Sequence, residues 1–421
     1  MPSPKTWIVL LAVFSAAPSR YLSADWQQWG GPDRNFMVDA RDLSESWDSD
    51  GPFSLFCHPL SGGHSAVVTS GDRVFVLHGQ KKRERLTALR SDGRLLWEKE
   101  YPVTYEARVE AHDGPHATPL IWEDLVITVS IDATVRGRSI ATGKEIWKRD
   151  LKADHGVTLP QAGFAASPMV VDRSIMLPGL GAAAPDNTRV EKAGLGVIAL
   201  DARTGRTRWA RHAFTSSHAS PVLIEVAGRR RAVFHGMEKL VALDAESGDV
   251  LLQLRVRSGA ADNVSFTPLW DPKSRTLFLS HAYDRLGMQA IQIPEEGGAP
   301  VRRWSNRKLK VEHGNAVLMN GMVIASHRGS PGFLVALDQE SGEERWRKRL
   351  PKAMFLRVGD RLLILDEKGT LHMARPDRSG PGIVSSLKLL DDITWTAPTI
   401  VGRTLYVRSP SLLRALELSE N

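Results

Sequence analysis

The sequence of 421 residues contains a single cysteine, Cys57. No intramolecular disulfide can form, and a metal centre built from several thiolates is excluded. The folded state must therefore be stabilised by packing and hydrogen bonding. Because an isolated thiol usually behaves as a small apolar group, we expect Cys57 to be buried.

The chain also lacks common short motifs of catalysis. It contains no G-x-x-x-x-G-K-S/T phosphate loop, no H-E-x-x-H zinc motif and no G-x-S-x-G nucleophile elbow. Two glycine-rich stretches, residues 179–187 and 189–197, lead into a predicted strand and not into a helix. They therefore favour a surface excursion over a phosphate-binding loop.

Long apolar runs are absent beyond the amino-terminal segment, so no later segment has the roughly 20 apolar residues of a membrane-spanning helix. Residues 7–17 are apolar but too short to span a bilayer, as is typical of a signal-peptide core. Cleavage after Ala24 is expected because the residues before the cut are small, and cleavage after Ala17 is the alternative. We expect residues 1–24 to be a signal peptide and the protein to be periplasmic or secreted. The competing interpretation is a buried amino-terminal strand.

The excess of positive charge is modest, with a formal net charge of +7. Residues 1–24 contain two basic residues and no acid, so removing them leaves +5. The densest basic runs, residues 81–85 and 229–231, fall where we expect hairpin connections. No aromatic residues interleave with these runs to stack on bases, so we predict solvated loop charge and no nucleic-acid partner.

What the sequence does contain is a repeat, seen most clearly in VALDQESGEERW at residues 335–346. Its first half alternates as a half-buried strand does. Asp338 can accept hydrogen bonds from loop amides, and Gly342 can adopt the left-handed conformation that a bulged hairpin turn needs. A second strand then ends on Trp346. The same pattern recurs at residues 87–97, 139–147, 198–209 and 241–252, with Leu252 in the Trp position of the last.

Each hairpin follows a second recurring piece that reads as strand, polar turn and strand. It is clearest in the stretches that begin at His116, His218 and Ser265. The two pieces make four short antiparallel strands over roughly 40 to 50 residues, the length of a propeller blade. Eight units can be counted, and their first strands begin near His64, His116, Ala165, His218, Ser265, His313, Lys352 and Trp395.

The last unit reaches only a third strand before the chain ends. An unpaired sheet edge invites foreign pairing, so another segment should complete this blade. Residues 51–60 are the candidate, and we expect residues 53–60 to pair with residues 405–418. The predicted fold is an all-β, eight-bladed β-propeller of four-stranded antiparallel blades, closed by an N-terminal strand, with residues 25–421 in a single domain.

These features resemble the pyrroloquinoline-quinone-type eight-bladed propellers over roughly residues 26–418. The A-L-D-x-x-x/T-G-x-x-x-W hairpin is similar to the tryptophan-docking motif of that family. The leader Asp25–Phe36 is similar to that of secreted bacterial members. The resemblance implies that the motif tryptophan packs between neighbouring blades, and core packing is also what a large ring at one repeated register favours. The tryptophans concerned are Trp97, Trp147, Trp209 and Trp346.

That family has two functional branches. One consists of quinoprotein dehydrogenases, and the other of non-enzymatic relatives such as the scaffold lipoprotein of the outer-membrane β-barrel assembly machinery. Many of the dehydrogenases have a disulfide between adjacent cysteines beside the quinone, which this chain cannot form. A quinone enzyme would also need a calcium site of carboxylate and amide oxygens and a carboxylate base. Residues near strand starts that could serve, although nothing assigns them, are Glu110, Asp113, Asp262, Asn263, Glu312 and Asn315.

We therefore expect an exported, monomeric, non-enzymatic binding or scaffold protein of the bacterial cell envelope, with no cofactor and no transmembrane segment after processing. Its partner is an unidentified protein or small ligand at the propeller face. No cysteine lies directly after the cleavage site, which argues against a lipoprotein form. The alternative is a pyrroloquinoline-quinone-dependent oxidoreductase with calcium, acting on alcohols or sugars.

Histidines recur at one position just before the first strand of four blades, where a propeller has the rim of its central channel. They are His64, His116, His218 and His313, with Lys352 nearby. One interpretation is an inherited structural residue that caps the strand start. The other is a ligand-binding mouth for an anion or a metal, with His64 and His116 on adjacent blades forming a pairwise site. The sequence leaves both open.

Overall fold

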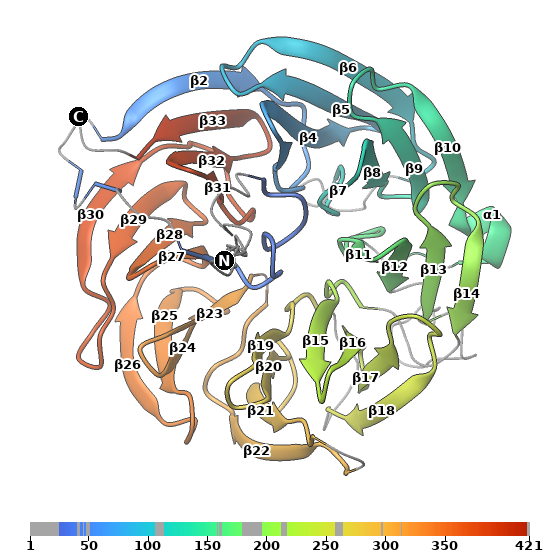
Figure 1. Cartoon of the computed structure of the whole chain (residues 1–421). Coiled ribbons are helices and arrows are strands. Elements are labelled where there is room, and N and C mark those ends of the chain that lie inside the picture. Colours follow the sequence, from blue (N-terminus) through green and yellow to red (C-terminus); the bar gives the residue numbers. More distant parts are fainter. Residues whose placement is uncertain are drawn as a thin grey trace, which may run out of the picture.

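The computed structural model describes residues 25–39, 43–44, 46–47, 51–105, 113–157, 159, 162–178, 196–211, 217–256, 264–295, 298–312 and 314–418. The expected signal peptide and nearly all of the two glycine-rich stretches lie outside these residues. The described strands form eight sheets arranged as a closed ring (Figure 1). This confirms the prediction of an all-β, eight-bladed propeller with four-stranded antiparallel blades.

The first four blades each run from an innermost to an outermost strand. Blade 1 consists of β3 (Val68–Ser70), β4 (Arg73–Gln80), β5 (Arg83–Arg90) and β6 (Leu95–Pro102). Blade 2 consists of β7 (Leu120–Trp122), β8 (Leu125–Val129), β9 (Thr134–Ser139) and β10 (Glu145–Asp150). Blade 3 consists of β11 (Met169–Val171), β12 (Ser174–Pro178), β13 (Val197–Asp201) and β14 (Thr207–Arg211). Blade 4 consists of β15 (Val222–Val226), β16 (Arg229–His235), β17 (Lys239–Asp244) and β18 (Val250–Arg255).

The other four blades include two strands from the amino-terminal segment. Blade 5 consists of β19 (Leu269–Asp271), β20 (Thr276–Ser280), β21 (Met288–Gln292) and β22 (Val301–Asn306). Blade 6 consists of β23 (Ala316–Met319), β24 (Met322–His327), β25 (Phe333–Asp338) and β26 (Glu344–Arg349). Blade 7 consists of β27 (Ala353–Val358), β28 (Arg361–Asp366), β29 (Thr370–Ala374), β30 (Ile383–Lys388) and the added β1 (Met37–Val38). Blade 8 consists of β31 (Thr399–Val401), β32 (Thr404–Arg408), β33 (Leu412–Glu417) and β2 (Phe53–Pro59).

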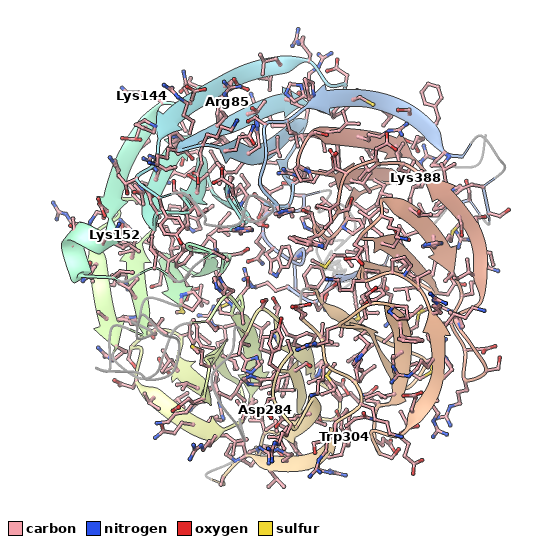
Figure 2. All side chains as sticks on the ribbon, turned by 180° about the vertical axis from the view of Figure 1, so that it is seen from behind. Arg85, Lys144, Lys152, Asp284, Trp304 and Lys388 are labelled. Carbon is pink, nitrogen blue, oxygen red and sulfur yellow. The ribbon has the colours of Figure 1, made fainter. Side chains whose placement is uncertain are left out.

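The core lies in the wedges between neighbouring blades, where apolar side chains of adjacent sheets pack face to face. Charged side chains such as Lys144 and Lys152 lie at the outer rim of the ring (Figure 2). A short helix, α1 (Leu151–His155), follows blade 2 and is capped by Asp150. Within the described residues, no helix combines the length and the apolar character that crossing a bilayer would require.

The hairpin between the third and fourth strands of blade 6 explains the repeat. The Asp338 carboxylate accepts two loop amides at 3.0 Å, and Gly342 has a φ of 73°. Partial burial alone would raise the pKa of Asp338, but hydrogen bonds from Arg345 and the loop amides lower it to about 2. The Asp and Gly of the motif are therefore both needed to hold the turn.

The ring is closed by the amino-terminal strand, as the sequence predicted. β2 pairs antiparallel with β33, so that Phe53 faces Glu417 and Pro59 faces Leu412. It therefore supplies the outermost strand that the carboxy-terminal segment lacks. A strand from the amino-terminal part of the chain and one from the carboxy-terminal part are therefore paired within one sheet.

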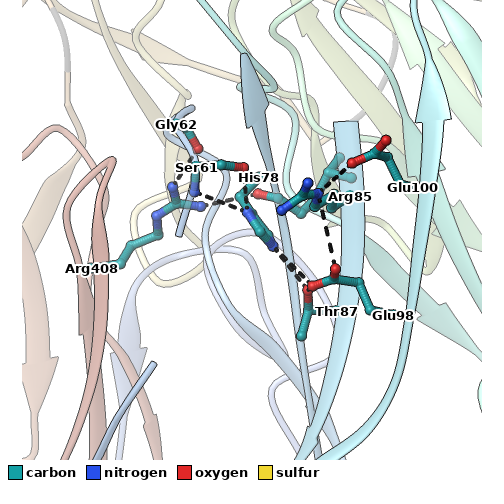
Figure 3. Close-up of polar contacts among 9 residues, drawn as sticks. Ser61, Gly62, His78, Arg85, Thr87, Glu98, Glu100 and Arg408 are labelled. Atoms are coloured by element: carbon teal, nitrogen blue, oxygen red, sulfur yellow. Dashed lines mark hydrogen bonds and ion pairs between the residues drawn. The ribbon is translucent and has the colours of Figure 1, made fainter. Parts of the chain in front are cut away.

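A buried arginine secures this joint between blades 8 and 1 (Figure 3). Arg408, at the end of β32, donates to the carbonyl oxygens of Gly62, Gly63, Ser65 and Leu77 at 2.7 to 3.0 Å. Gly62, Gly63 and Ser65 belong to the connection between β2 and blade 1, and Leu77 lies in β4. One guanidinium group of β32 therefore binds two segments of the amino-terminal part of the chain, β4 and the connection after β2.

A histidine extends this joint toward the surface. The backbone N–H of Ser61 donates to Nδ1 of His78 at 3.1 Å, and Nε2 of His78 lies 2.9 Å from the Thr87 hydroxyl. That hydroxyl donates to the Glu98 carboxylate at 2.7 Å. Burial, followed by the positive charge of Arg408, lowers the pKa of His78 to about 3. His78 is therefore neutral at physiological pH.

The leader before the first blade crosses the centre of the ring (dark blue in Figure 1). It ends in β1, which pairs in parallel with β27 of blade 7. Contacts along the leader join Trp26 to Thr69, Gln27 to Ile121, Trp29 to Thr267 and Arg34 to Pro168 and Pro221. The leader thus binds blades 1, 2, 3, 4, 5 and 7.

The expectation that Cys57 is buried is wrong, because its side chain is exposed. Side chains alternate along β2, and Phe56 takes the face that packs on blade 1, against Gly93. Cys57 therefore points the other way. At the outer rim of the ring, that face of the strand is left uncovered.

Candidate ligand site at the mouth of the central channel

The segments before the innermost strands are joined by a recurring Ser or Thr. Its hydroxyl accepts the backbone N–H of the equivalent residue in the preceding blade. The bonds run from Ala66 to Thr118 at 3.0 Å, from Thr118 to Ser167 at 3.0 Å and from Ser167 to Ser220 at 2.9 Å. His64, His116 and His218 each lie two residues before a member of this ladder. The ladder therefore sets where the histidines meet the channel.

A cavity of about 130 Å³ lies where these segments converge. Three of the four predicted histidines line it: His64 from blade 1, His116 from blade 2 and His218 from blade 4. The fourth, His313, lies outside the described residues. Among the described residues, no Asp or Glu lines this cavity.

The pair expected from adjacent blades does come together. The rings of His64 and His116 are stacked, with centroids 5.6 Å apart and planes inclined by 12°. His64 also contacts the Trp395 ring of blade 8, at 5.0 Å between centroids. Whether this pair binds a ligand stays a prediction.

The stacked arrangement bears on the choice between a metal and an anion. A metal ion lies in the plane of an imidazole that ligates it, at about 2.0 to 2.1 Å from nitrogen for zinc. Two stacked rings cannot both direct a nitrogen at one ion unless one ring turns. In the described part of the chain, no group of three or more His, Cys, Asp or Glu residues has the geometry to hold a metal ion.

Lys352 lies beside the cavity and not in its lining. Its Nζ is 5.8 Å from the centre of the Trp395 ring. It is also 3.7 Å from the Glu312 carboxylate and 3.4 Å from that of Glu367. Lys352 is therefore engaged in ion pairs that link blades 6 and 7.

Trp29 of the leader lines the cavity. Its indole N–H donates to the Thr267 hydroxyl at 3.0 Å, and its ring packs edge-on against Phe36 at 5.0 Å. No pattern in the sequence indicated this residue. The leader is not part of the repeat, so no register argument could place Trp29 in the channel.

Of the residues considered for a calcium site, the three that the structure describes belong to no group that could hold a metal ion. Asp113 accepts the amides of Lys81 and Gly114, and Asn315 pairs with the backbone of Phe355. Glu312 contacts Tyr283 and Lys352. The other three candidates, Glu110, Asp262 and Asn263, lie outside the described residues.

The four motif tryptophans lie in the wedges between blades. Each indole N–H donates to a carbonyl of the next blade: Trp97 to Ile140, Trp147 to Ala202, Trp209 to Glu246 and Trp346 to Asp377, at 2.7 to 3.1 Å. Across the hairpin each ring faces a small residue, respectively Ala88, Gly137, Ala199 and Ala336. The Ala of the A-L-D motif therefore makes room for the ring.

Two further residues occupy this position and were missed. Trp304 of blade 5 faces Ala290 and donates to the Gln339 carbonyl at 3.1 Å. Phe56 of β2 faces Ala415 in blade 8. A large ring that pairs with an Ala across the hairpin is the signal that could have found both residues. In these two blades the hairpin departs from the A-L-D motif, so the sequence does not show which residues pair.

A family model described as outer membrane protein assembly factor BamB matches most of the chain. It matches twice, with an overlap, over residues 33–209 and 178–348. No curated protein sequence matches the chain significantly.

Solved structures show the same fold. The structure of BamB from Moraxella catarrhalis has 14% sequence identity and a TM-score of 0.58, covering 87% of this chain and 99% of that one. The computationally designed Ika8 protein has 12% identity and a TM-score of 0.57, covering 86% and 98%. Quinohemoprotein alcohol dehydrogenase from Comamonas testosteroni has 12% identity and a TM-score of 0.50, covering 94% and 81%.

Proposed function

Because the chain belongs to the family of outer membrane protein assembly factor BamB, we propose that it is a non-enzymatic binding or scaffold protein of the bacterial cell envelope. It acts as a monomer, exported to the periplasm or secreted after removal of residues 1–24. It binds a protein or a small ligand at the face that contains the channel mouth. The observation that carries this proposal is the family match, which spans most of the blades.

The mouth supports binding over catalysis. Its three histidines and two tryptophans offer ring surface, while its lining has no Asp, Glu or Cys among the described residues. Beside it, Tyr283 is exposed, contacts Glu312 and lies beneath the Arg328 guanidinium at 3.9 Å from the ring centre. Tyr and Arg side chains are enriched at protein interfaces.

The quinone-dependent alternative finds less support, because the residues at the mouth do not fit that cofactor. In the described part of the chain, no carboxylate lines the cavity to hold calcium or to act as a base. The one cysteine, Cys57, lies at the outer rim of blade 8. The cavity of about 130 Å³ is also smaller than the usual 300 to 1,000 Å³ of cofactor-sized sites.

A cofactor test separates the two candidates. Purified protein would be incubated with pyrroloquinoline quinone and calcium, desalted, and examined for quinone absorbance and for dye reduction with alcohols and sugars. We expect neither retained quinone nor turnover. Retained quinone with turnover would reverse the proposal in favour of the oxidoreductase.

A cross-linking test examines the binding role directly. A photoreactive residue would be introduced at Tyr283, beside the mouth, and as a control at Leu95, which is exposed at the start of β6 on the opposite face. In cells of the source organism we expect a discrete cross-linked product from position 283 only. Equal products from both positions, or none from position 283, would contradict a partner at the mouth.

A further inference from the structure

Three hydroxyl groups of the mouth cavity already accept one hydrogen bond each. Ser167 accepts the N–H of Thr118, Ser220 accepts the N–H of Ser167, and Thr267 accepts the indole N–H of Trp29. A hydroxyl has one proton to donate as well as two lone pairs. Within the described residues, none of these three hydroxyls donates to a protein acceptor. Their protons are therefore available to a ligand in the cavity.

Two buried positive charges lie behind the wall of the cavity. Arg34 donates to the carbonyl oxygen of Ser167, and Arg408 donates to that of Gly63, the neighbour of His64. Arg34 is 3% exposed and Arg408 is 1% exposed. Neither has an ion-pair partner among the described residues, and burial lowers the pKa of each to about 9. Both guanidinium groups are therefore charged at neutral pH.

Two carboxylates near the mouth lie outside the lining of the cavity. Glu312 and Glu367 are the carboxylates next to Lys352, and they form ion pairs with it outside the lining. The interior thus combines hydroxyl donors, imidazole rings and positive charge behind the wall. A buried cavity with these groups favours an anion and disfavours a cation.

We propose that the mouth cavity binds one small oxyanion, a carboxylate or a phosphate group, through these hydroxyl protons and the field of the two buried arginines. The inference rests on the proposed role of the mouth as a binding site. A cavity of about 130 Å³ suits a group of this size. The carboxylate of a partner protein's side chain and inorganic phosphate share this chemistry.

Calorimetry of the intact protein at neutral pH and low ionic strength tests the proposal. The probes are inorganic phosphate, acetate as a stand-in for a side-chain carboxylate, and zinc chloride. We expect binding of at least one oxyanion at one site per chain and no competing zinc site. Binding of acetate alone would identify a protein carboxylate as the source, and binding of phosphate alone a phosphate group.

Matched variants locate the site. Ser265 lines the cavity but takes no part in the hydroxyl ladder, so Ser265→Asp adds a repelling charge there. We expect it to weaken oxyanion binding by about tenfold or more, because like charges brought together at close range are strongly unfavourable. The control Ser54→Asp adds the same charge on the exposed strand β2 and should leave affinity unchanged.

A second variant tests the proposal at a residue that does not line the cavity. Arg34→Met removes a charge behind the wall and should weaken oxyanion binding several-fold in protein that still melts cooperatively. The proposal is overturned if the wild type binds neither oxyanion at about 10 mM, roughly tenfold above the Kd of a weak, 1 mM site. It is also overturned if Ser265→Asp binds like the wild type, or if zinc binds in place of the oxyanions.

Calorimetry and cross-linking together distinguish a failure of the oxyanion site from a failure of the proposed function. Oxyanion binding without a Tyr283 cross-link would keep the anion site and remove the scaffold role. A Tyr283 cross-link without oxyanion binding would do the reverse.

Discussion

At the scale of single residues, packing between blades depends on close contacts between tryptophan rings and the glycines of the repeat in the next blade. A Cβ atom added to Gly342 would lie 2.5 Å from the Trp304 ring of the preceding blade. The same relation holds between Gly205 and Trp147, also at 2.5 Å. The glycine of the repeat is therefore required twice, for its positive φ and for the neighbouring ring.

Two substitutions can separate the requirement for a positive φ from the requirement for space beside the ring. Gly342→Ala and Gly228→Ala both place a Cβ at positive φ, 73° and 70°, but only Gly342 faces a ring, since nothing lies within 4 Å of the Cβ position at Gly228. We expect Gly342→Ala to cost about 2 kcal/mol more in unfolding free energy, as overpacking does. Urea denaturation measures both. Equal losses would show that the backbone conformation alone sets the requirement.

A buried carboxyl between blades 1 and 2 makes stability depend on pH. Glu84 is fully buried, accepts the amide of Ile131 at 2.8 Å, and has its pKa raised to about 7 by burial. Between pH 4.5 and 7 the folded protein holds a proton that the unfolded chain has released, so this group lowers stability as pH rises through that window.

The variant Glu84→Gln should abolish this loss. Its stability relative to the wild type should increase between pH 4.5 and 7 by up to about 3 kcal/mol, at 1.36 kcal/mol per pKa unit. Urea denaturation at several pH values gives the difference, in which contributions of other groups such as His78 cancel. Glu100→Gln is the control, because hydrogen bonds from Arg85 and Arg83 lower the pKa of that exposed carboxyl below this window. A pH-independent difference for Glu84→Gln would refute the assignment.

At the scale of elements, the joint between β32, β4 and the connection after β2 depends on one side chain. Arg408 belongs to β32 and satisfies carbonyl oxygens of the other two, among them those of Gly62 and Leu77. A cation that binds several carbonyls inside a protein is costly to remove, because each acceptor then stays buried without a donor.

Arg408→Met keeps the volume of this side chain and removes its donors. We expect a loss of at least about 3 kcal/mol, since each hydrogen bond to a charged group contributes about 1.5 to 3 kcal/mol. Arg347→Met, which removes a surface ion pair with Glu344, should cost less than about 1 kcal/mol. Chemical denaturation compares the two variants. Similar losses would mean that Arg408 does not hold the joint.

At the scale of the whole molecule, closing the ring requires a strand from the amino-terminal part of the chain, β2, and one from the carboxy-terminal part, β33. β2 completes blade 8, and the leader binds six of the eight blades from the channel side. A propeller open at one blade exposes the edge of β33 to other chains.

Deleting residues 25–60 should therefore produce an aggregating protein. The control is a permuted chain that begins at residue 61 and carries residues 51–60 after residue 418 through a glycine-rich linker, which restores β2 but not the leader. We expect this control to be monomeric by size-exclusion chromatography. A soluble deletion variant with an unchanged melting temperature would contradict the closing role of β2.

Much of the architecture could be predicted because the blade repeat is a local pattern. Alternation along strands and an Asp and a Gly at one spacing specify each hairpin without reference to the rest of the chain. The count of eight blades, the missing strand supplied by β2 and the shared register of His64, His116 and His218 all followed from this pattern.

Only the tertiary structure decided what meets at the centre and the rim. Trp29 and Arg34 reach the channel because the non-repeated leader crosses it, and Cys57 is exposed because β2 is outermost. The buried charge of Arg408 likewise depends on blades 8 and 1 becoming neighbours. These contacts join residues far apart in sequence, and closure of the ring brings them together, so no local period encodes them.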